Sequence, residues 1–191
     1  MPDQVSYRAE VPADREAIRR VHTSAFGDDG TVAALTDALR AAPAPLAPLS
    51  FVASADGGSG GEIVGHVMLS ASRLDAPPRL VSVYVLSPLG VLPGYQRQGI
   101  GTALIEVALA AARDSGVPLV FLEGDPAYYG RRGFERADAR GFRAPSLRIP
   151  PPAFQVARMP GHEPWMTGTL VYHDAFWAYD CVGLREEPTN P

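Results

Sequence analysis

One stretch of the chain, Val91–Gly116, constrains the fold more than any other. An apolar segment with the composition of a buried strand, Val81–Val91, runs into a short loop, and Gly99 and Gly101 then open a strongly apolar helix. The first turn of a helix carries N–H groups without internal partners, and the helix dipole adds partial positive charge there. Glycine lets an anion approach the backbone closely and permits positive φ. This order predicts a binding site for a ligand that carries a diphosphate.

Side chains just before the helix strengthen that prediction. Gln96, Arg97 and Gln98 supply hydrogen-bond donors, and the guanidinium of Arg97 is permanently charged. All 17 basic residues of the chain are arginines. The absence of lysine excludes a P-loop lysine and a Schiff-base lysine from the mechanism.

Composition limits the class of protein. With 191 residues and 46% apolar residues, the chain is expected to form a single domain with a substantial core. The formal charge of −4 argues against a nucleic-acid partner. The single cysteine, Cys181, offers no internal disulfide, and neither a long apolar run nor a signal-peptide pattern is present. We therefore expect a cytoplasmic protein without a membrane partner.

The histidines do not have metal-ligand spacing, so no metal site is expected. They are His22, His66, His162 and His173. His22 falls on the apolar face of a predicted helix, which is typical of a histidine at the edge of a core.

Apolar periodicity and breakers predict one α+β domain over residues 1–191, with its core at about 4–137. The expected elements are strands at 5–8, 49–54, 62–74, 81–91 and 117–124, helices at about 12–26, 31–42 and 100–116, a helical turn at 126–131 and a strand from Phe134. Residues 145–164 contain six prolines and are expected to be loop. A strand and an aromatic segment are expected within 167–184.

A dinucleotide-binding interpretation explains the glycine pair less well. Leu104 occupies the place of the third glycine that such a motif requires, although Glu123 lies at about the distance of its acidic residue. The motif also lies mid-chain, after strands that have the pattern of an antiparallel meander.

Two motifs together resemble the GNAT superfamily of N-acetyltransferases. The first is the acetyl-CoA loop pattern [Gln/Arg]-x-x-Gly-x-[Gly/Ala] with the preceding Val-x-Pro-x-Tyr, here Gln96, Gly99 and Gly101 after Val91, Pro93 and Tyr95. The second is the Tyr-x-x-x-Gly-Phe signature within YYGRRGF, here Tyr128, Tyr129, Gly133 and Phe134. The order of predicted elements over about 4–137 agrees with that family as well.

The resemblance implies a mixed, mostly antiparallel sheet flanked by helices, with a parallel strand pair at the cofactor cleft. It implies a bulged strand whose backbone at Leu89, Gly90 and Val91 pairs with the pantetheine arm. A backbone N–H near Val91 would polarise the acetyl carbonyl. It also implies that Tyr128 contacts the cofactor. The pyrophosphate would be held by the backbone amides of the loop and first helical turn: Gln96, Arg97, Gln98, Gly99, Ile100, Gly101 and Thr102.

The implied reaction is direct attack of an amine on the thioester of acetyl-CoA in a ternary complex. Tyr129 matches the position of the family's acid, which protonates the departing thiolate. Many relatives carry a glutamate on the strand before the loop, but residues 84–91 contain no carboxylate. Glu123 and Asp125 at the end of the next strand are the nearest candidates for the base, and capping or loop hydrogen bonds are their structural alternative.

The acceptor is expected to be the amine of a small molecule, and the acidic balance of the chain mildly favours a cationic one. Three alternatives stay open: a non-catalytic acyl-CoA-binding sensor, a protein N-acetyltransferase, and a longer acyl donor. The C-terminal aromatics would be compatible with a homodimer.

Overall fold

The structure, a computed structural model, describes residues 5–43, 45–55 and 61–183. Its strands are β1 (Ser6–Ala9), β2 (Leu49–Ser54), β3 (Ile63–Asp75), β4 (Leu80–Val91), β5 (Leu119–Glu123), β6 (Glu135–Arg136), β7 (Phe142–Arg143), β8 (Phe154–Arg158) and β9 (Gly168–Val171). Its α-helices are α1 (Arg15–Phe26), α2 (Thr31–Ala41), α3 (Ile100–Asp114), α4 (Pro126–Tyr129) and α5 (Asp174–Ala178).

Within these residues the strands form one mixed sheet in the order β1-β2-β3-β4-β5-β8-β6, and β9 pairs with both β3 and β7. Neighbours along the main path are antiparallel except β4 and β5, which run parallel. The short β7–β9 pair is parallel too. The fold class expected from the sequence is therefore confirmed, including the parallel pair beside the predicted cofactor loop.

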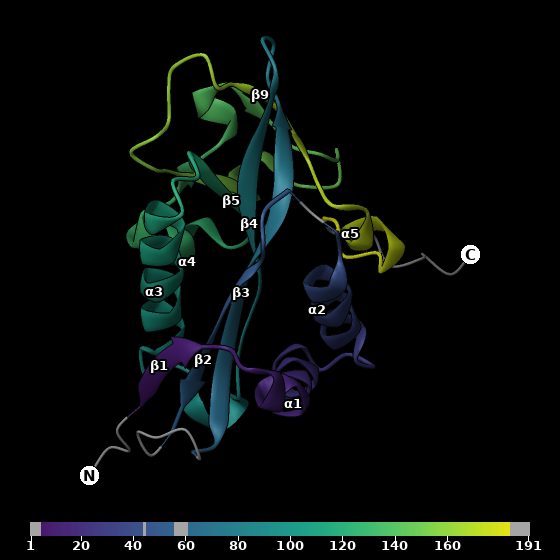
Figure 1. Cartoon of the computed structure of the whole chain (residues 1–191), viewed down its shortest axis with the longest axis vertical. Helices are drawn as coiled ribbons and strands as arrows, with labels where there is room; N and C mark the ends of the chain where they lie inside the picture. The colour runs from purple at the N-terminus through teal and green to yellow at the C-terminus, as the bar shows by residue number, and fades with distance from the viewer. Residues whose placement is uncertain (1–4, 44, 56–60, 184–191) are drawn as a thin grey trace.

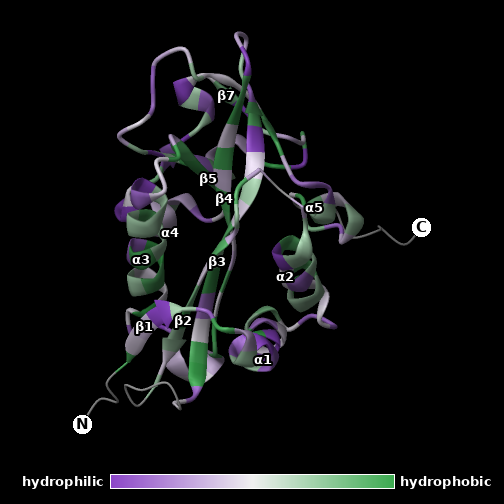
Figure 2. Cartoon of the chain, viewed as in Figure 1, coloured by the Kyte–Doolittle hydropathy of each residue, from purple (hydrophilic) through white to green (hydrophobic). Residues whose placement is uncertain are grey.

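Helices cover both faces of the sheet (Figure 1). The helix α3 lies on one face, whereas α1, α2 and α5 lie on the other. In α3 the buried side chains recur every three or four residues, as Ile100, Leu104, Ala108 and Ala112 show, so one stripe faces the sheet. Figure 2 shows the resulting pattern, with apolar residues along the central strands and polar residues on the outer helix surfaces.

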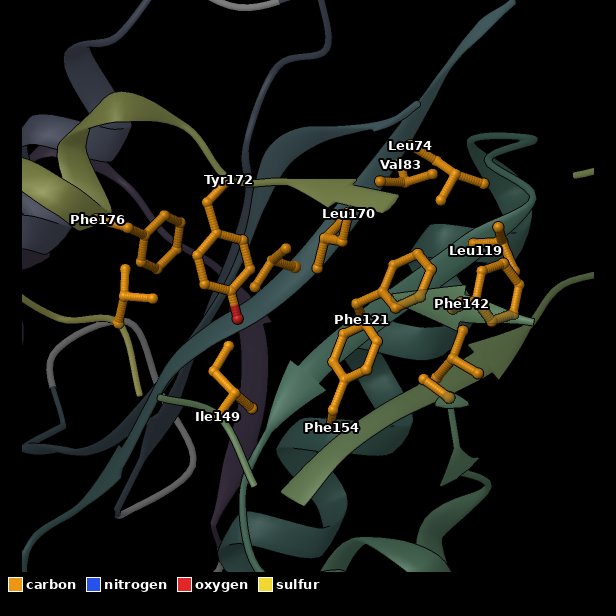
Figure 3. Packing of buried hydrophobic residues seen from close by; sticks show 14 of the residues in the cluster. Leu74, Val83, Leu119, Phe121, Phe142, Ile149, Phe154, Leu170, Tyr172 and Phe176 are labelled. Carbon is orange, nitrogen blue, oxygen red and sulfur yellow. The ribbon is translucent and has the colours of Figure 1, made fainter. Parts of the chain in front are cut away.

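The core on the α2 and α5 side is rich in aromatic rings (Figure 3). Phe121 of β5 stacks on Phe154 of β8 with ring centroids 5.6 Å apart, and it meets Phe142 of β7 edge-on at 5.1 Å. Tyr172 and Phe176 continue this cluster toward α5. The rings join strands that are distant in the sequence.

The expectation that residues 145–164 are loop throughout is wrong, because β8 lies inside this segment. The prolines precede or follow β8 and none stands in it, so its N–H groups are free to pair. β8 is paired on both sides, with β5 and with β6, and Phe154 and Val156 are buried in the aromatic core. The core accordingly extends past residue 137.

No helix in the described part of the chain is both long and apolar enough to cross a lipid bilayer.

The role of β8 predicts a large difference between two substitutions in the proline-rich segment. Phe154→Ala should lower the free energy of unfolding by about 3–5 kcal/mol, because it leaves a cavity beside Phe121. Leu147→Ala, at a fully exposed side chain, should change it by less than about 0.5 kcal/mol. Chemical denaturation of both variants measures the difference, and equal effects would contradict the place of β8 in the core.

Candidate active site

The parallel contact between β4 and β5 is short. Register pairs are found only at Tyr84–Val120 and Val85–Phe121. Beyond that point β4 bulges: two residues, Ser87 and Pro88, stand opposite one residue of β3. The two strands therefore separate toward their C-terminal ends, and the bulge expected before the glycine loop is present.

After the bulge, the N–H and C=O groups of successive β4 residues point alternately toward β3 and away from it. The Leu92 N–H donates to the Val64 carbonyl of β3 at 2.9 Å, and Gly90 lies opposite His66 in the same register. Alternate residues of an antiparallel strand face the same neighbour, so Leu89 and Val91 direct their N–H and C=O groups away from β3, toward the β5 side. These are the strand positions at which an added extended chain could pair.

The glycine loop then delivers the chain to α3. Gly99 is the N-cap with φ 87°, and no side chain of the described part of the chain caps the helix. The first intrahelical bond comes from the Ala103 N–H, which donates to the Gly99 carbonyl. The N–H groups of Ile100, Gly101 and Thr102 consequently have no helical acceptor, which makes this turn a cradle for an anion.

The loop geometry has two further features. Arg97 stands at φ 62°, in the left-handed region that non-glycine residues rarely adopt, and this turns the backbone sharply before the helix. The side-chain amides of Gln96 and Gln98 donate to the carbonyls of Val91 and Gly94. These two side chains were expected to donate to a ligand, but here they form hydrogen bonds that stabilise the loop itself.

Tyr128 closes one side of the cradle. A Cβ at Gly101 would lie 2.6 Å from the Tyr128 hydroxyl oxygen, so the tyrosine closely approaches the first turn of α3 at this glycine. Arg132 lies over the Tyr128 ring at 3.6 Å and donates to Thr102 Oγ1 at 2.9 Å. The two sequence motifs thus meet in space, and a second guanidinium stands beside the anion cradle.

Tyr129 lies against the end of β5. A Cβ at Gly124 would come 2.5 Å from the Tyr129 ring, and the ring also packs edge-on against Tyr128 and Phe134. Burial raises the pKa of Tyr129 to about 12, and the nearby Tyr128 adds to the increase. The hydroxyl is protonated over the whole physiological range and can act as a donor.

Glu123 lies on the opposite face of the same strand end. Its carboxylate accepts from the Gly183 N–H at 2.9 Å and weakly from the Tyr172 hydroxyl at 3.4 Å. Burial raises the pKa of Glu123, and these hydrogen bonds only partly oppose the increase. A half-buried carboxylate of this kind is suited to accept a proton. Asp125 instead caps α4, where it accepts from the Ala127 N–H at 2.9 Å.

The structure therefore places the predicted residues in two groups around the separated strands. The glycine loop, Tyr128 and Tyr129 lie on the α3 side, while Glu123 lies on the side of Tyr172 and the C-terminal segment. Sequence reasoning missed Arg132, although its place within YYGRRGF was a signal. Among the described residues, no three His, Cys, Asp or Glu side chains gather to hold a metal ion.

Comparison with known proteins agrees with this geometry. Residues 15–134 match the model of the acetyltransferase (GNAT) family. The chain belongs to the acetyltransferase (GNAT) family. It is 34% identical over 137 residues to an uncharacterised N-acetyltransferase of Escherichia coli, YjhQ, covering 70% of this chain and 71% of that protein.

Two solved structures of family members have the same fold. The Escherichia coli N-acetyltransferase YhbS in complex with CoA has a TM-score of 0.79 at 28% identity, covering 91% of this chain and 92% of that one. A GNAT acetyltransferase of Brucella melitensis in complex with acetyl-CoA has a TM-score of 0.70 at 32% identity, covering 91% and 99%. The expectation of an acetyl-CoA-dependent acetyltransferase is confirmed at the level of the family.

The contact between Tyr128 and α3 predicts the effect of a large side chain at residue 101. The family pattern accepts alanine at this place, so the test needs a larger group. In Gly101→Leu, the side chain displaces the Tyr128 hydroxyl and occupies the cradle beside the free N–H groups of α3, so affinity for CoA should fall at least about tenfold. The helix should still form, because leucine favours a helix more than glycine does. Gly94→Leu is the matched control, since a Cβ there meets no atom of the described residues within 4 Å. Calorimetric titration with CoA tests both variants, and unchanged affinity in Gly101→Leu would contradict the assigned cradle.

Proposed function

We propose that this acetyltransferase moves the acetyl group of acetyl-CoA directly to the primary amine of a small molecule, in a ternary complex. The observation that carries the proposal is the separation of β4 from β5 directly beside the anion cradle of α3. A cofactor anchored on the α3 side can extend along this opening, so that its thioester faces an acceptor on the other side of the sheet.

In this proposal the cofactor binds through backbone and side-chain groups along one path. Leu89, Gly90 and Val91 form the strand segment beside the pantetheine arm, and Tyr128 packs against the cofactor. The amides of residues 96–102 hold the pyrophosphate, as a helix N-terminus does for phosphates. Arg132 adds a charge-assisted contact, because Thr102 fixes its guanidinium next to the cradle.

Tyr129 is the proposed acid. Its hydroxyl is protonated at neutral pH, and it can donate to the CoA thiolate as the C–S bond breaks. The thiolate carries the negative charge that forms in this step, so a donor placed there stabilises the transition state more than the ground state.

Glu123 is the proposed base. An alkyl ammonium ion must lose a proton before its nitrogen can attack the thioester, because the nitrogen lone pair is otherwise occupied. The carboxylate of Glu123 accepts this proton, directly or through one water, at the acceptor side of the opening. Burial raises the pKa of Glu123. The proton affinity of Glu123 is therefore closer to that of the acceptor amine than the proton affinity of an exposed carboxylate is.

A small acceptor fits the space beside Glu123. A cavity of about 410 Å³ is lined by Glu123, Gly124, Asp125, Pro126, Pro150, Ala153 and Gly183. This volume suits a small molecule. Two carboxylates in the lining favour an amine that is cationic in solution.

The proposal also includes a cytoplasmic location and a homodimer. The exposed Trp177 and Tyr179 of the C-terminal segment would lie in the dimer interface.

A screen of small amines for thiol release from acetyl-CoA tests the transfer itself. At least one amine should raise thiol release above the rate with buffer alone. If CoA binds and the whole library is inactive, transfer of acetyl to a small amine is contradicted, and the sensor, the protein N-acetyltransferase and the longer acyl donor are the alternatives that replace it.

Loss of the acid should affect turnover and leave binding intact. Tyr129→Phe keeps the ring against Gly124 and removes only the hydroxyl, so kcat should fall about 100-fold while the Kd for acetyl-CoA changes less than about twofold. Tyr7→Phe, on β1 at the opposite end of the sheet order from β5, is the control and should retain full activity. Unchanged kcat in Tyr129→Phe would remove Tyr129 as the acid.

The base should be visible in the pH dependence. Glu123 works only when ionised, so kcat/KM should rise with pH through its raised pKa and reach a plateau above it. Glu123→Gln should lose this acidic limb and about 100-fold of the plateau rate. Asp125→Asn, which alters the neighbouring carboxylate, should keep the limb. An acidic limb that survives in Glu123→Gln would assign the base elsewhere.

A further inference from the structure

A chain of buried polar groups lies beneath α1, on the face of the sheet opposite α3. His22 of α1 and His66 of β3 are both fully buried, and His22 Nε2 lies 2.7 Å from His66 Nδ1. His66 Nε2 lies 2.8 Å from the Ser50 hydroxyl of β2, which donates to the carboxylate of Glu10. Arg40 of α2 pairs with the same carboxylate at 2.7 Å.

Counting donors fixes the proton positions along this chain. Ser50 has one hydroxyl proton and gives it to Glu10, so it accepts from His66 Nε2–H. The neutral His66 then has its lone pair on Nδ1, and His22 must donate to it from Nε2. The remaining nitrogen of His22, Nδ1, is therefore an unprotonated acceptor.

The charges agree with this assignment. Burial lowers the pKa of His22 to about 2 and also lowers the pKa of His66, so both rings are neutral. Burial alone would raise the pKa of Glu10, but the nearby His66 and the hydrogen bonds from Arg40 and Ser50 lower it to about 2. The anionic carboxylate at one end thus orients two neutral imidazoles.

The other end of the chain meets the cofactor strand. His22 Nδ1 is buried and has no hydrogen-bond partner among the residues that the structure describes. It faces Gly90 of β4, where a Cβ would lie 2.9 Å from Nδ1 and 3.2 Å from Cε1. Gly90 also stands opposite His66 in the β3–β4 register. A buried nitrogen without a partner lowers the stability of the folded protein. Its position against Gly90 therefore suggests that the contact has a functional role.

We propose that His22 is a positioning residue for acetyl transfer: pressed against Gly90, it holds Leu89–Val91 of β4 in the geometry that receives the pantetheine arm. The chain from Glu10 keeps the His22 ring in one orientation, and Gly90 admits the ring because it has no side chain. The helix α1 on the acceptor side is thereby coupled to the strand on which the cofactor lies. This inference rests on the proposed function, which places the pantetheine arm along Leu89–Val91.

A double-mutant cycle between residues 22 and 90 tests the coupling. Gly90→Ala in the wild-type chain should lower kcat/KM for acetyl-CoA about tenfold, because the new Cβ pushes β4 away from the His22 ring. In a His22→Gln background, where a flexible side chain can move aside, the same substitution should cost less than about twofold. His162→Gln is the control background, and there the full tenfold loss should remain.

Each variant is used only if its thermal unfolding is cooperative and its melting temperature lies close to that of its background, so a loss of fold is not counted as a loss of positioning. An equal loss from Gly90→Ala in all three backgrounds would overturn the proposal. If His22→Gln fails to fold, imidazole ¹⁵N spectra decide: the wild-type chain should show His22 protonated at Nε2 only, and Gly90→Ala should shift the His22 signals. His22 signals that stay unchanged while kcat/KM falls would overturn the proposal.

The same measurements separate this inference from the proposed function. A wild-type chain that binds no CoA and releases no thiol with any amine contradicts the proposed function, and the proposal for His22 falls with it. A wild-type chain that binds CoA and transfers acetyl, but shows no coupling between residues 22 and 90, contradicts the positioning role alone.

Discussion

The separation of β4 from β5 is the constraint on which the site depends. Two parallel strands that stayed paired to their ends would satisfy each other's backbone and leave no line of N–H and C=O groups for a ligand. Here the pairing ends at Val85 and Phe121, and the bulge at Ser87–Pro88 turns β4 aside. The opening is thus produced by the sheet itself, and the chemistry on either side follows from the alternation of side chains along β5.

In the proposed mechanism, that alternation divides the reaction between the two faces of the sheet. Phe121 and Glu123 point to the face that carries Tyr172 and α5, whereas Leu122 points to the α3 face, where Tyr129 also packs. Gly124 lies between the two groups, and its lack of a side chain lets the Tyr129 ring approach. An acid near the leaving thiolate and a base near the incoming amine need this arrangement, because the two partners approach the thioester from different sides.

Positive charge gathers at the first turn of α3 although the whole chain is acidic. The chain carries a net charge of −4, yet the turn that begins α3 combines free helical N–H groups with Arg97 and Arg132. Tyr128 links these parts, since its hydroxyl meets Gly101 and its ring supports the Arg132 guanidinium. The net charge of the chain argues against a nucleic-acid partner, but it does not reveal the positively charged turn at the start of α3.

What could be predicted from the sequence was what local backbone chemistry determines. The glycine pair, the helix that it opens and the tyrosines of YYGRRGF are short-range patterns, and the structure places them around one turn. β8 could not be seen, because six nearby prolines masked a five-residue strand whose pairing partners are distant in the sequence. The His22–His66 contact was equally invisible, since it joins residues 44 positions apart on two elements that only the fold brings together.

The acceptor side depends on the same kind of distant contact. The pKa of Glu123 is raised because the carboxylate is buried, and the groups that contact it, Tyr172 and Gly183, come from the C-terminal segment. Tyr172 is in turn fixed by its packing against Phe176 of α5. The proton affinity of the proposed base is therefore set by how the last part of the described chain closes over β5. Relatives that share the glycine loop but differ in this segment should bind the same cofactor with a different base strength, and therefore with a different pH dependence of transfer.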